Sequence, residues 1–252
     1  MLRRAHAHPF PSRRGLRGAL IAAATGLLLV PAASLAATGG GGTSSQTTTT
    51  APVHRANRTE TVSGDGITVH AVQSGVLTWR TKFFGTTPSR DAGKIIEIER
   101  TAKPGSTTWM VATKTTVASG GTFATSWRAN KAGKLAFRAI ILRSSTTASA
   151  AAASPSLHIT VFRLSRASWY GPGFFGHRTA CGQILRKTTL GVANRSLKCG
   201  TKVSILYHGH SIRVPVIDRG PYTKGVYWDL TEATAQALGM TETERVGTLF
   251  PA

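Results

Sequence analysis

The fold of the C-terminal third is decided by two short stretches, VIDRGPY at residues 216–222 and WDLTE at residues 228–232. The first stretch ends an expected strand and places a carboxylate and a guanidinium, Asp218 and Arg219, at its exit. The second supplies another carboxylate, Asp229, just before an expected helix. Two acids that strand ends bring together are suited to a site for acid catalysis.

Residues 233–239, ATAQALG, predict this helix, because they combine an apolar stripe with a terminating glycine. Asp229 and Glu232 have the spacing of a capping box at its start, so capping alone could explain both acids. A carboxyl buried near Asp218 would instead have a raised pKa, as a general acid needs. Asp218 and Asp229 are therefore the candidate catalytic residues.

Upstream of these stretches, residues 201–207 and 210–217 predict two strands joined by a hairpin turn. The turn carries His208 and His210, but zinc needs at least a third ligand, so no metal site and no cofactor are predicted. Further upstream, residues 167–176, ASWYGPGFFG, place aromatic side chains on tightly turned backbone. Such a surface could stack on sugar rings, or it could only plug one end of a barrel.

Six motifs follow one another along the C-terminal third: ASWYG (167–171), RTACG (178–182), TLGVA (189–193), LKCGT (197–201), DRGPY (218–222) and DLT (229–231). In this pattern residues 165–252 resemble the rare lipoprotein A (RlpA)-like double-psi β-barrel, which is related to the expansin and barwin barrels. The resemblance implies a six-stranded barrel with a short helix that acts on bacterial cell walls. The best-studied members are lytic transglycosylases, in which a carboxylic acid protonates the glycosidic oxygen and the sugar's own 6-hydroxyl is the nucleophile.

The sequence departs from the enzymatic pattern of that family at two positions. Gln183 stands where the active enzymes carry a glutamate, and Asn194 stands where they carry a histidine. Neither amide can exchange a proton. Asp218 and Asp229 match instead the pair that expansin-like barrels use to loosen polysaccharide without efficient hydrolysis.

Two functions therefore stay open. One is a peptidoglycan lytic transglycosylase with a degenerate site and one of the two aspartates as its acid. The other is a non-catalytic, expansin-like module that binds peptidoglycan or another polysaccharide, or loosens the wall. The binding module would use tryptophan and tyrosine rings as a stacking surface for the glycan. The expected substrate-binding residues are Trp169, Tyr170, Gln183, Asn194, Arg219 and Trp228.

Residues 1–36 predict a secretory signal peptide, because five arginines precede an apolar run at residues 19–30. That run is shorter than the roughly 20 residues of a membrane-spanning helix, so no stable span is expected after cleavage. A retained anchor is the alternative, and either the Sec or the twin-arginine route would fit. Residues 37–59 are rich in Gly and Thr and predict a flexible linker. The protein is therefore expected to be secreted and associated with the cell wall.

The net charge of the chain is +21, which removal of residues 1–36 with their five arginines would lower to +16. Charged residues make up only 16% of the chain, so this excess arises from a scarcity of acids. In an exported protein the charge favours anionic wall polymers as partners over nucleic acid. Solubility alone is the alternative explanation.

Cys181 and Cys199 are the two cysteines of the sequence, too few for a disulfide-rich miniprotein or a four-thiolate zinc site. They enclose seventeen residues in a chain that is expected to be exported. Oxidising compartments favour closure of such a pair, so we expect a disulfide, with a free pair as the alternative.

Residues 60–163 predict an immunoglobulin-like β-sandwich, because short β-rich segments alternate with Gly, Pro, Ser and Asn turns. Residues 144–156 are rich in Ala, Ser and Thr and are expected to form a loop. The chain as a whole is thus expected to be all-β. The expected strands of the sandwich are residues 67–71, 76–83, 95–100, 109–115, 123–128, 135–142 and 157–162.

Overall fold

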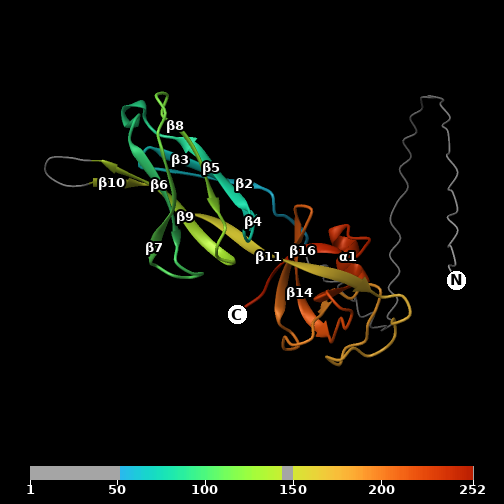
Figure 1. The fold of residues 1–252 in the computed structure, drawn as a ribbon. Helices are drawn as coiled ribbons and strands as arrows, with labels where there is room; N and C mark the ends of the chain where they lie inside the picture. The colour runs from blue at the N-terminus through green and yellow to red at the C-terminus, as the bar shows by residue number, and fades with distance from the viewer. Residues whose placement is uncertain (1–51, 144–149, 252) are drawn as a thin grey trace, which may run out of the picture. The chain divides into compact units, whose positions relative to one another are not determined.

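The computed structural model describes residues 52–143 and 150–251. The predicted signal peptide, residues 37–51 of the predicted linker and residues 144–149 of the predicted loop lie outside the described residues. Within the described residues the chain is mostly β-structure, with one short α-helix (Figure 1). No helix in this part of the chain has the length and apolar character needed to cross a membrane.

The N-terminal part contains two β-sheets that share one apolar core. The first sheet has the order β2-β3-β5-β8, formed by β2 (Thr59–Gly64), β3 (Ile67–Val72), β5 (Arg80–Thr86) and β8 (Thr122–Arg128). The second has the order β11-β9-β6-β7, formed by β6 (Ile95–Thr101), β7 (Trp109–Thr116), β9 (Gly133–Arg143) and β11 (Leu157–Tyr170). The remaining elements are β4 (Ser74–Val76) beside β11, β10 (Ala150–Ala153) beside β9, and the short 3-10 helix η1 (Ser89–Asp91).

Strict alternation of exposed and buried residues along β5 gives this strand one face in the core and one face in solvent. Phe83 from β5 and Trp127 from β8 both contact Phe137 of the opposite sheet, with ring centroids 5.2 Å apart in each pair. Such aromatic contacts add to the free energy gained by burial. The two sheets therefore form a sandwich, and its assignment as immunoglobulin-like stays a prediction.

Local structure differs from the prediction in four places, the first of which is β2, a strand that the sequence analysis does not predict. Residues 76–83 are predicted as one strand, but the chain turns at Thr78, whose φ is +73°, so β4 and β5 are separate. β10 lies within residues 144–156, which are predicted as a loop, because pairing with β9 holds these alanines in strand conformation. β1 (His54–Arg55) lies within the predicted linker and pairs with β14.

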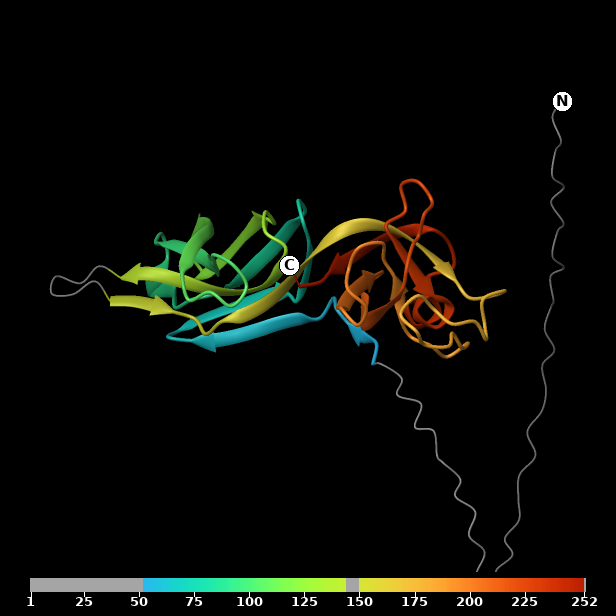
Figure 2. The same ribbon diagram turned by 90° about the horizontal axis from the view of Figure 1, so that it is seen from below.

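Six strands close into a barrel in the C-terminal part (Figure 1). The ring runs β11-β16-β13-β14-β12-β15 and returns to β11. β11 is one continuous strand whose residues 157–161 pair with β9 and whose residues 163–170 pair with β16 and β15 (Figure 2). The predicted six-stranded barrel with a short helix is thus confirmed. Its other elements are β12 (Val192–Ala193), β13 (Lys202–Tyr207), β14 (His210–Asp218), β15 (Trp228–Thr231), α1 (Glu232–Leu238) and β16 (Glu244–Leu249).

Close backbone packing at Gly191 fixes the barrel strands that carry the two aspartates. A Cβ atom at this position would lie 2.6 Å from the Ile217 side chain, so only glycine fits without displacement. The N–H and C=O of Gly191 are both hydrogen-bonded by the hydroxyls of Thr231 and Thr234, at 2.9 to 3.2 Å. This buried network ties the start of β12 to the start of α1.

The N-cap of α1 is Thr231, and not Asp229 as the capping-box spacing predicts. Thr231 Oγ1 accepts a hydrogen bond from the Thr234 N–H at 3.3 Å, whereas Asp229 lies within β15. The helix ends at Gly239, the predicted terminating glycine, in the left-handed conformation with φ of +73°. Capping therefore does not explain Asp229, whose carboxylate is available for another role.

Candidate active site

The two candidate carboxylates lie in one row of residues across four neighbouring strands. Ala193 of β12 is the register partner of both Asp218 on β14 and Asp229 on β15. Asp229 is in turn the register partner of Ser168 on β11. Because neighbouring strands are about 4.8 Å apart, the Cα atoms of the two aspartates are separated by about 10 Å.

Asp229 has the environment of a general acid. It is half-buried, and its Oδ1 accepts a hydrogen bond of 2.8 Å from the Ser168 hydroxyl. Burial raises the pKa of Asp229 to about 6, assisted by the negative charge of Asp218 and opposed by the hydrogen bond from Ser168. A carboxyl with this pKa can both give and take a proton near neutral pH.

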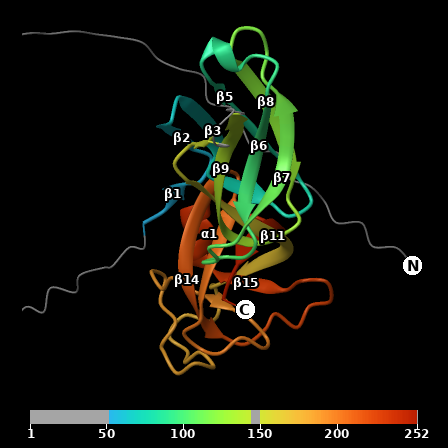
Figure 3. The same ribbon diagram turned by 90° about the vertical axis from the view of Figure 1, so that its left-hand side faces the viewer.

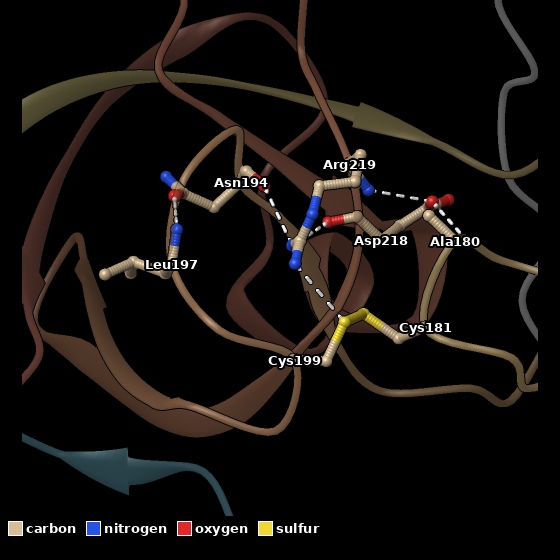
Figure 4. The surroundings of a disulfide bond; sticks show 7 residues. All are labelled: Ala180, Cys181, Asn194, Leu197, Cys199, Asp218 and Arg219. Carbon is tan, nitrogen blue, oxygen red and sulfur yellow. Dashed lines mark hydrogen bonds between the residues drawn. A yellow bond between two sulfur atoms is a disulfide. The ribbon is translucent and has the colours of Figure 1, made fainter.

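Asp218 is held by backbone donors (Figure 4). The N–H groups of Ala180 and Arg219 donate to its Oδ1 at 2.9 and 2.8 Å. These bonds fix the carboxylate at the end of β14, from where its charge acts on Asp229. Nowhere in the described residues do three His, Cys, Asp or Glu side chains gather as metal ligands.

Tyr170 turns its hydroxyl toward the two carboxylates. It lies two residues after Ser168 on β11, and so on the same face of that strand. Burial raises the pKa of its phenol, as do the nearby charges of Asp218 and Asp229. The hydroxyl is buried and faces the Asp218 carboxylate, whose hydrogen bond with it also raises the pKa of the phenol, although the pair falls outside ordinary hydrogen-bond geometry. Tyr170 therefore offers the site a polar donor, rather than the open stacking surface that the sequence predicts.

The predicted disulfide between Cys181 and Cys199 is present and joins two loops beside the end of β14 (Figure 4). The Cys181 N–H donates to the Ile217 carbonyl at 3.3 Å, which ties this loop to the strand. Arg219 Nη2 donates to Cys199 Sγ at 3.4 Å, and its Nη1 donates to the Asn194 carbonyl at 3.3 Å. The guanidinium predicted to contact substrate is thus engaged with the loops of the protein itself.

The two amides that replace proton-exchanging residues have different surroundings. Asn194 Oδ1 accepts hydrogen bonds from the N–H groups of Ser196 and Leu197, at 3.2 and 3.0 Å, and its Nδ2 donates to the Tyr227 carbonyl at 3.3 Å. This side chain therefore shapes the loop that follows β12. Gln183 is exposed in the loop before β12, where it can meet a ligand.

The predicted stacking role does not fit the burial of Trp228, whereas Trp169 is only partly buried. Trp228 is only 3% exposed in the barrel core, and its ring centroid lies 5.5 Å from that of Phe250. Trp169 packs against the same core, and its Nε1 donates to the Thr241 carbonyl at 3.0 Å. Large aromatic rings bury much apolar area, so here they stabilise the barrel.

The exposed rings near the site are Tyr222 and Tyr227, which the sequence analysis does not single out. Their side chains are 80% and 60% exposed, and both lie between β14 and β15, that is, between the two aspartates in the chain. The segment around them has glycine, proline and lysine without apolar periodicity, which is the signal that its aromatics stay outside the core. Phe174, also exposed, lies against Tyr170 with ring centroids 6.1 Å apart.

Comparison with known proteins finds similarity in the part of the chain that forms the barrel. A family described as "Lytic transglycolase" matches residues 163–249. The probable endolytic peptidoglycan transglycosylase RlpA of Synechocystis sp. is 46% identical over 76 residues, which make up 29% of this chain and 24% of that protein. The protein of the same description from Aquifex aeolicus is 42% identical over 76 residues, 29% of this chain and 34% of its own. The endolytic peptidoglycan transglycosylase RlpA of Campylobacter jejuni is 37% identical over 76 residues, 29% of this chain and 28% of its own.

The fold and these matches define the class of the C-terminal part, a double-psi β-barrel. More particularly, residues 163–249 are an RlpA-like domain, as the sequence motifs predict. The chain spans only 24% to 34% of the length of the three relatives, so the match concerns this domain.

Proposed function

We propose that the barrel cleaves peptidoglycan glycan strands as a lytic transglycosylase, with Asp229 as its acid. The observation that carries this proposal is a half-buried carboxyl on the same row of strand residues as a second carboxylate, an environment that raises its pKa to about 6. Ordinary aspartate carboxyls titrate near pH 4 and hold almost no proton at pH 7. Asp229 instead keeps a proton available for a leaving group near neutral pH. The similarity to RlpA proteins supports peptidoglycan as the substrate.

The proposed reaction needs a single carboxyl. The Asp229 carboxyl gives its proton to the glycosidic oxygen, and the bond between that oxygen and the anomeric carbon of the sugar breaks. The 6-hydroxyl oxygen of the same sugar then bonds to this carbon, and the hydroxyl proton passes to the Asp229 carboxylate. The product ends in a 1,6-anhydro sugar, no water is consumed, and the acid is ready for the next turnover.

The neighbours of Asp229 take roles that follow from their contacts. The fixed negative charge of Asp218 would stabilise the positive charge that develops on the sugar ring. The Tyr170 hydroxyl, which is buried beside Asp218, would help to hold that carboxylate in place. The exposed rings of Tyr222 and Tyr227 offer surfaces on which neighbouring sugars could stack.

Peptidoglycan lies outside the cytoplasm, so this function requires export. The predicted signal peptide at residues 1–36 would provide it, and a closed disulfide is typical of oxidising compartments. We therefore place the protein outside the cytoplasm, secreted and associated with the wall.

A second function, glycan binding without cleavage, is favoured by the two amides. Gln183 cannot exchange a proton, and the Asn194 side chain is used by the loop after β12. A barrel of this kind would hold or loosen glycan strands, as the resemblance to expansin-like barrels implies.

Purified glycan strands, stripped of their peptides, distinguish the two functions. We expect the protein to release fragments that end in 1,6-anhydro-muramyl groups. A positioned acid contributes about 10² to 10⁴-fold to a rate, so Asp229→Asn, which keeps the size of the side chain, should lose nearly all release. Gln183→Glu should increase the rate, because it adds a proton-exchanging group at an exposed position. Strand binding without products, equal in the native protein and in Asp229→Asn, would establish the binding function instead.

A further inference from the structure

The sheet β2-β3-β5-β8 has one face in the sandwich core and one face open (Figure 3). Side chains alternate along a strand, and register partners point to the same side. Phe83, Phe123 and Trp127 point into the core, so their neighbours in each strand point outward. The outer face, as we call it, consists of the odd-numbered residues of β2 and the even-numbered residues of β3, β5 and β8.

The outer face carries cations and no carboxylate. Arg80 and Lys82 are exposed on β5, and the exposed Arg128 on β8 is the register partner of Arg80. None of the three forms an ion pair with a described carboxylate. Glu60, the one acid in these four strands, points to the other side, where it accepts hydrogen bonds from Gln73 Nε2 and the His158 N–H. A surface with charge of a single sign favours a polyanion as its partner.

The rest of the outer face suits sugar rings. Phe84 is 48% exposed and stacks on His70, with ring centroids 4.9 Å apart and planes at 18°. His70 is held in turn by a hydrogen bond of 2.7 Å between its Nδ1 and Thr61 Oγ1. Next to this pair, the hydroxyls of Ser63 and Thr68 lie 2.9 Å apart. A rigid ring among hydroxyl groups can stack on a sugar while the hydroxyls bind its polar edge.

A shallow hollow of about 570 Å³ brings the two kinds of group together, because Arg80, Lys82, Phe84 and Ser126 all line it. We propose that the outer face binds an acidic polysaccharide. The acidic groups of the polymer pair with the three cations, and one of its sugar rings stacks on Phe84. This surface belongs to the sandwich, so binding there does not depend on cleavage by the barrel. It would be the binding site for the anionic wall polymers that the net charge of the chain favours as partners.

Binding of the purified protein to polygalacturonate tests the role of the cations. Exposed ion pairs contribute about 0.2 to 1 kcal/mol each, so replacing all three outer-face cations by glutamine should weaken binding about tenfold. A control variant with the same loss of charge at exposed positions outside the outer face should weaken it less than about twofold. If the control weakens binding as much as the test variant, total charge is responsible and the proposal fails. The test variant is Arg80→Gln, Lys82→Gln, Arg128→Gln, and the control is Arg90→Gln, Lys103→Gln, Lys131→Gln.

The sugar contact is tested by Phe84→Ala, with far-UV circular dichroism to show that the sheet is intact. Stacking contributes about 0.5 to 1.5 kcal/mol, so binding to polygalacturonate should weaken roughly two- to tenfold. Binding to inorganic polyphosphate, which has no rings, should not change. An unchanged affinity for polygalacturonate would overturn the polysaccharide as the occupant. Asp229→Asn should bind polygalacturonate as the native protein does. The binding result therefore tests the outer face alone, whether or not the barrel cleaves glycan strands.

Discussion

Ser168→Ala tests whether one hydrogen bond sets the acidity of Asp229. The variant removes the 2.8 Å hydrogen bond from Ser168 Oγ to Asp229 Oδ1, which stabilises the carboxylate form. A hydrogen bond to a charged group contributes about 1.5 to 3 kcal/mol, and partial exposure of Asp229 favours the lower value. At about 1.4 kcal/mol for each pH unit, the pKa of Asp229 should rise by about one unit.

The assay is a titration of the Asp229 carboxyl carbon by nuclear magnetic resonance, in the native protein and in the variant. If Asp229 is the acid of the reaction, the fall in 1,6-anhydro product release at high pH should move upward by the same amount. Ser168→Thr keeps the hydroxyl and should titrate like the native protein. Ser165→Ala, which removes a hydroxyl that lies 3.3 Å from Thr248 Oγ1, is the control on the same strand. An unchanged or lower pKa of Asp229 in Ser168→Ala would refute this account of the site.

Three further predictions concern stability. Gly191→Ala should lower the free energy of unfolding by about 1 to 3 kcal/mol, because its Cβ would overlap buried Ile217, whereas Gly120→Ala, with nothing within 4 Å, should be neutral in the same urea titration. The raised pKa of Asp229 means that the folded state holds its proton to higher pH than the unfolded state does, so native stability should fall as pH rises from about 4 to 6. Asp229→Asn should not show that fall, and parallel stability profiles for the two proteins would contradict the burial of the charge. Reduction of the disulfide should cost about 3 kcal/mol, and thiol labelling of the unreduced, denatured protein should find no free cysteine.

Local signals explain which parts of the fold were predictable. The hairpin of β13 and β14 and the disulfide follow from alternation and from the number and spacing of cysteines, which are properties of short segments. β10 could not be predicted, because alanines form a strand there only by pairing with β9. The break at Thr78 interrupts a segment whose composition is typical of one strand.

The sequence is enough to choose the two acids of the candidate site, but it does not predict which side chains surround them. Asp218 and Asp229 could be chosen from the motifs, since both end or start recognisable elements. The direction of each neighbouring side chain depends on the register of β11, β12 and β15, which closure of the barrel sets. Trp228 therefore proved to be a core residue, and the buried hydroxyl of Tyr170 had no signal in the sequence.

Closure of the six barrel strands also bears on how this protein can associate with other chains. A sheet edge presents unpaired N–H and C=O groups that template aggregation, and a closed ring has no such edge. Every strand of the ring pairs with two others, and the start of β14, which β12 does not reach, is covered by β1 from the same chain. Within the described residues the ring therefore offers little free edge, and strand addition from another molecule is expected chiefly at the outermost strands of the sandwich sheets.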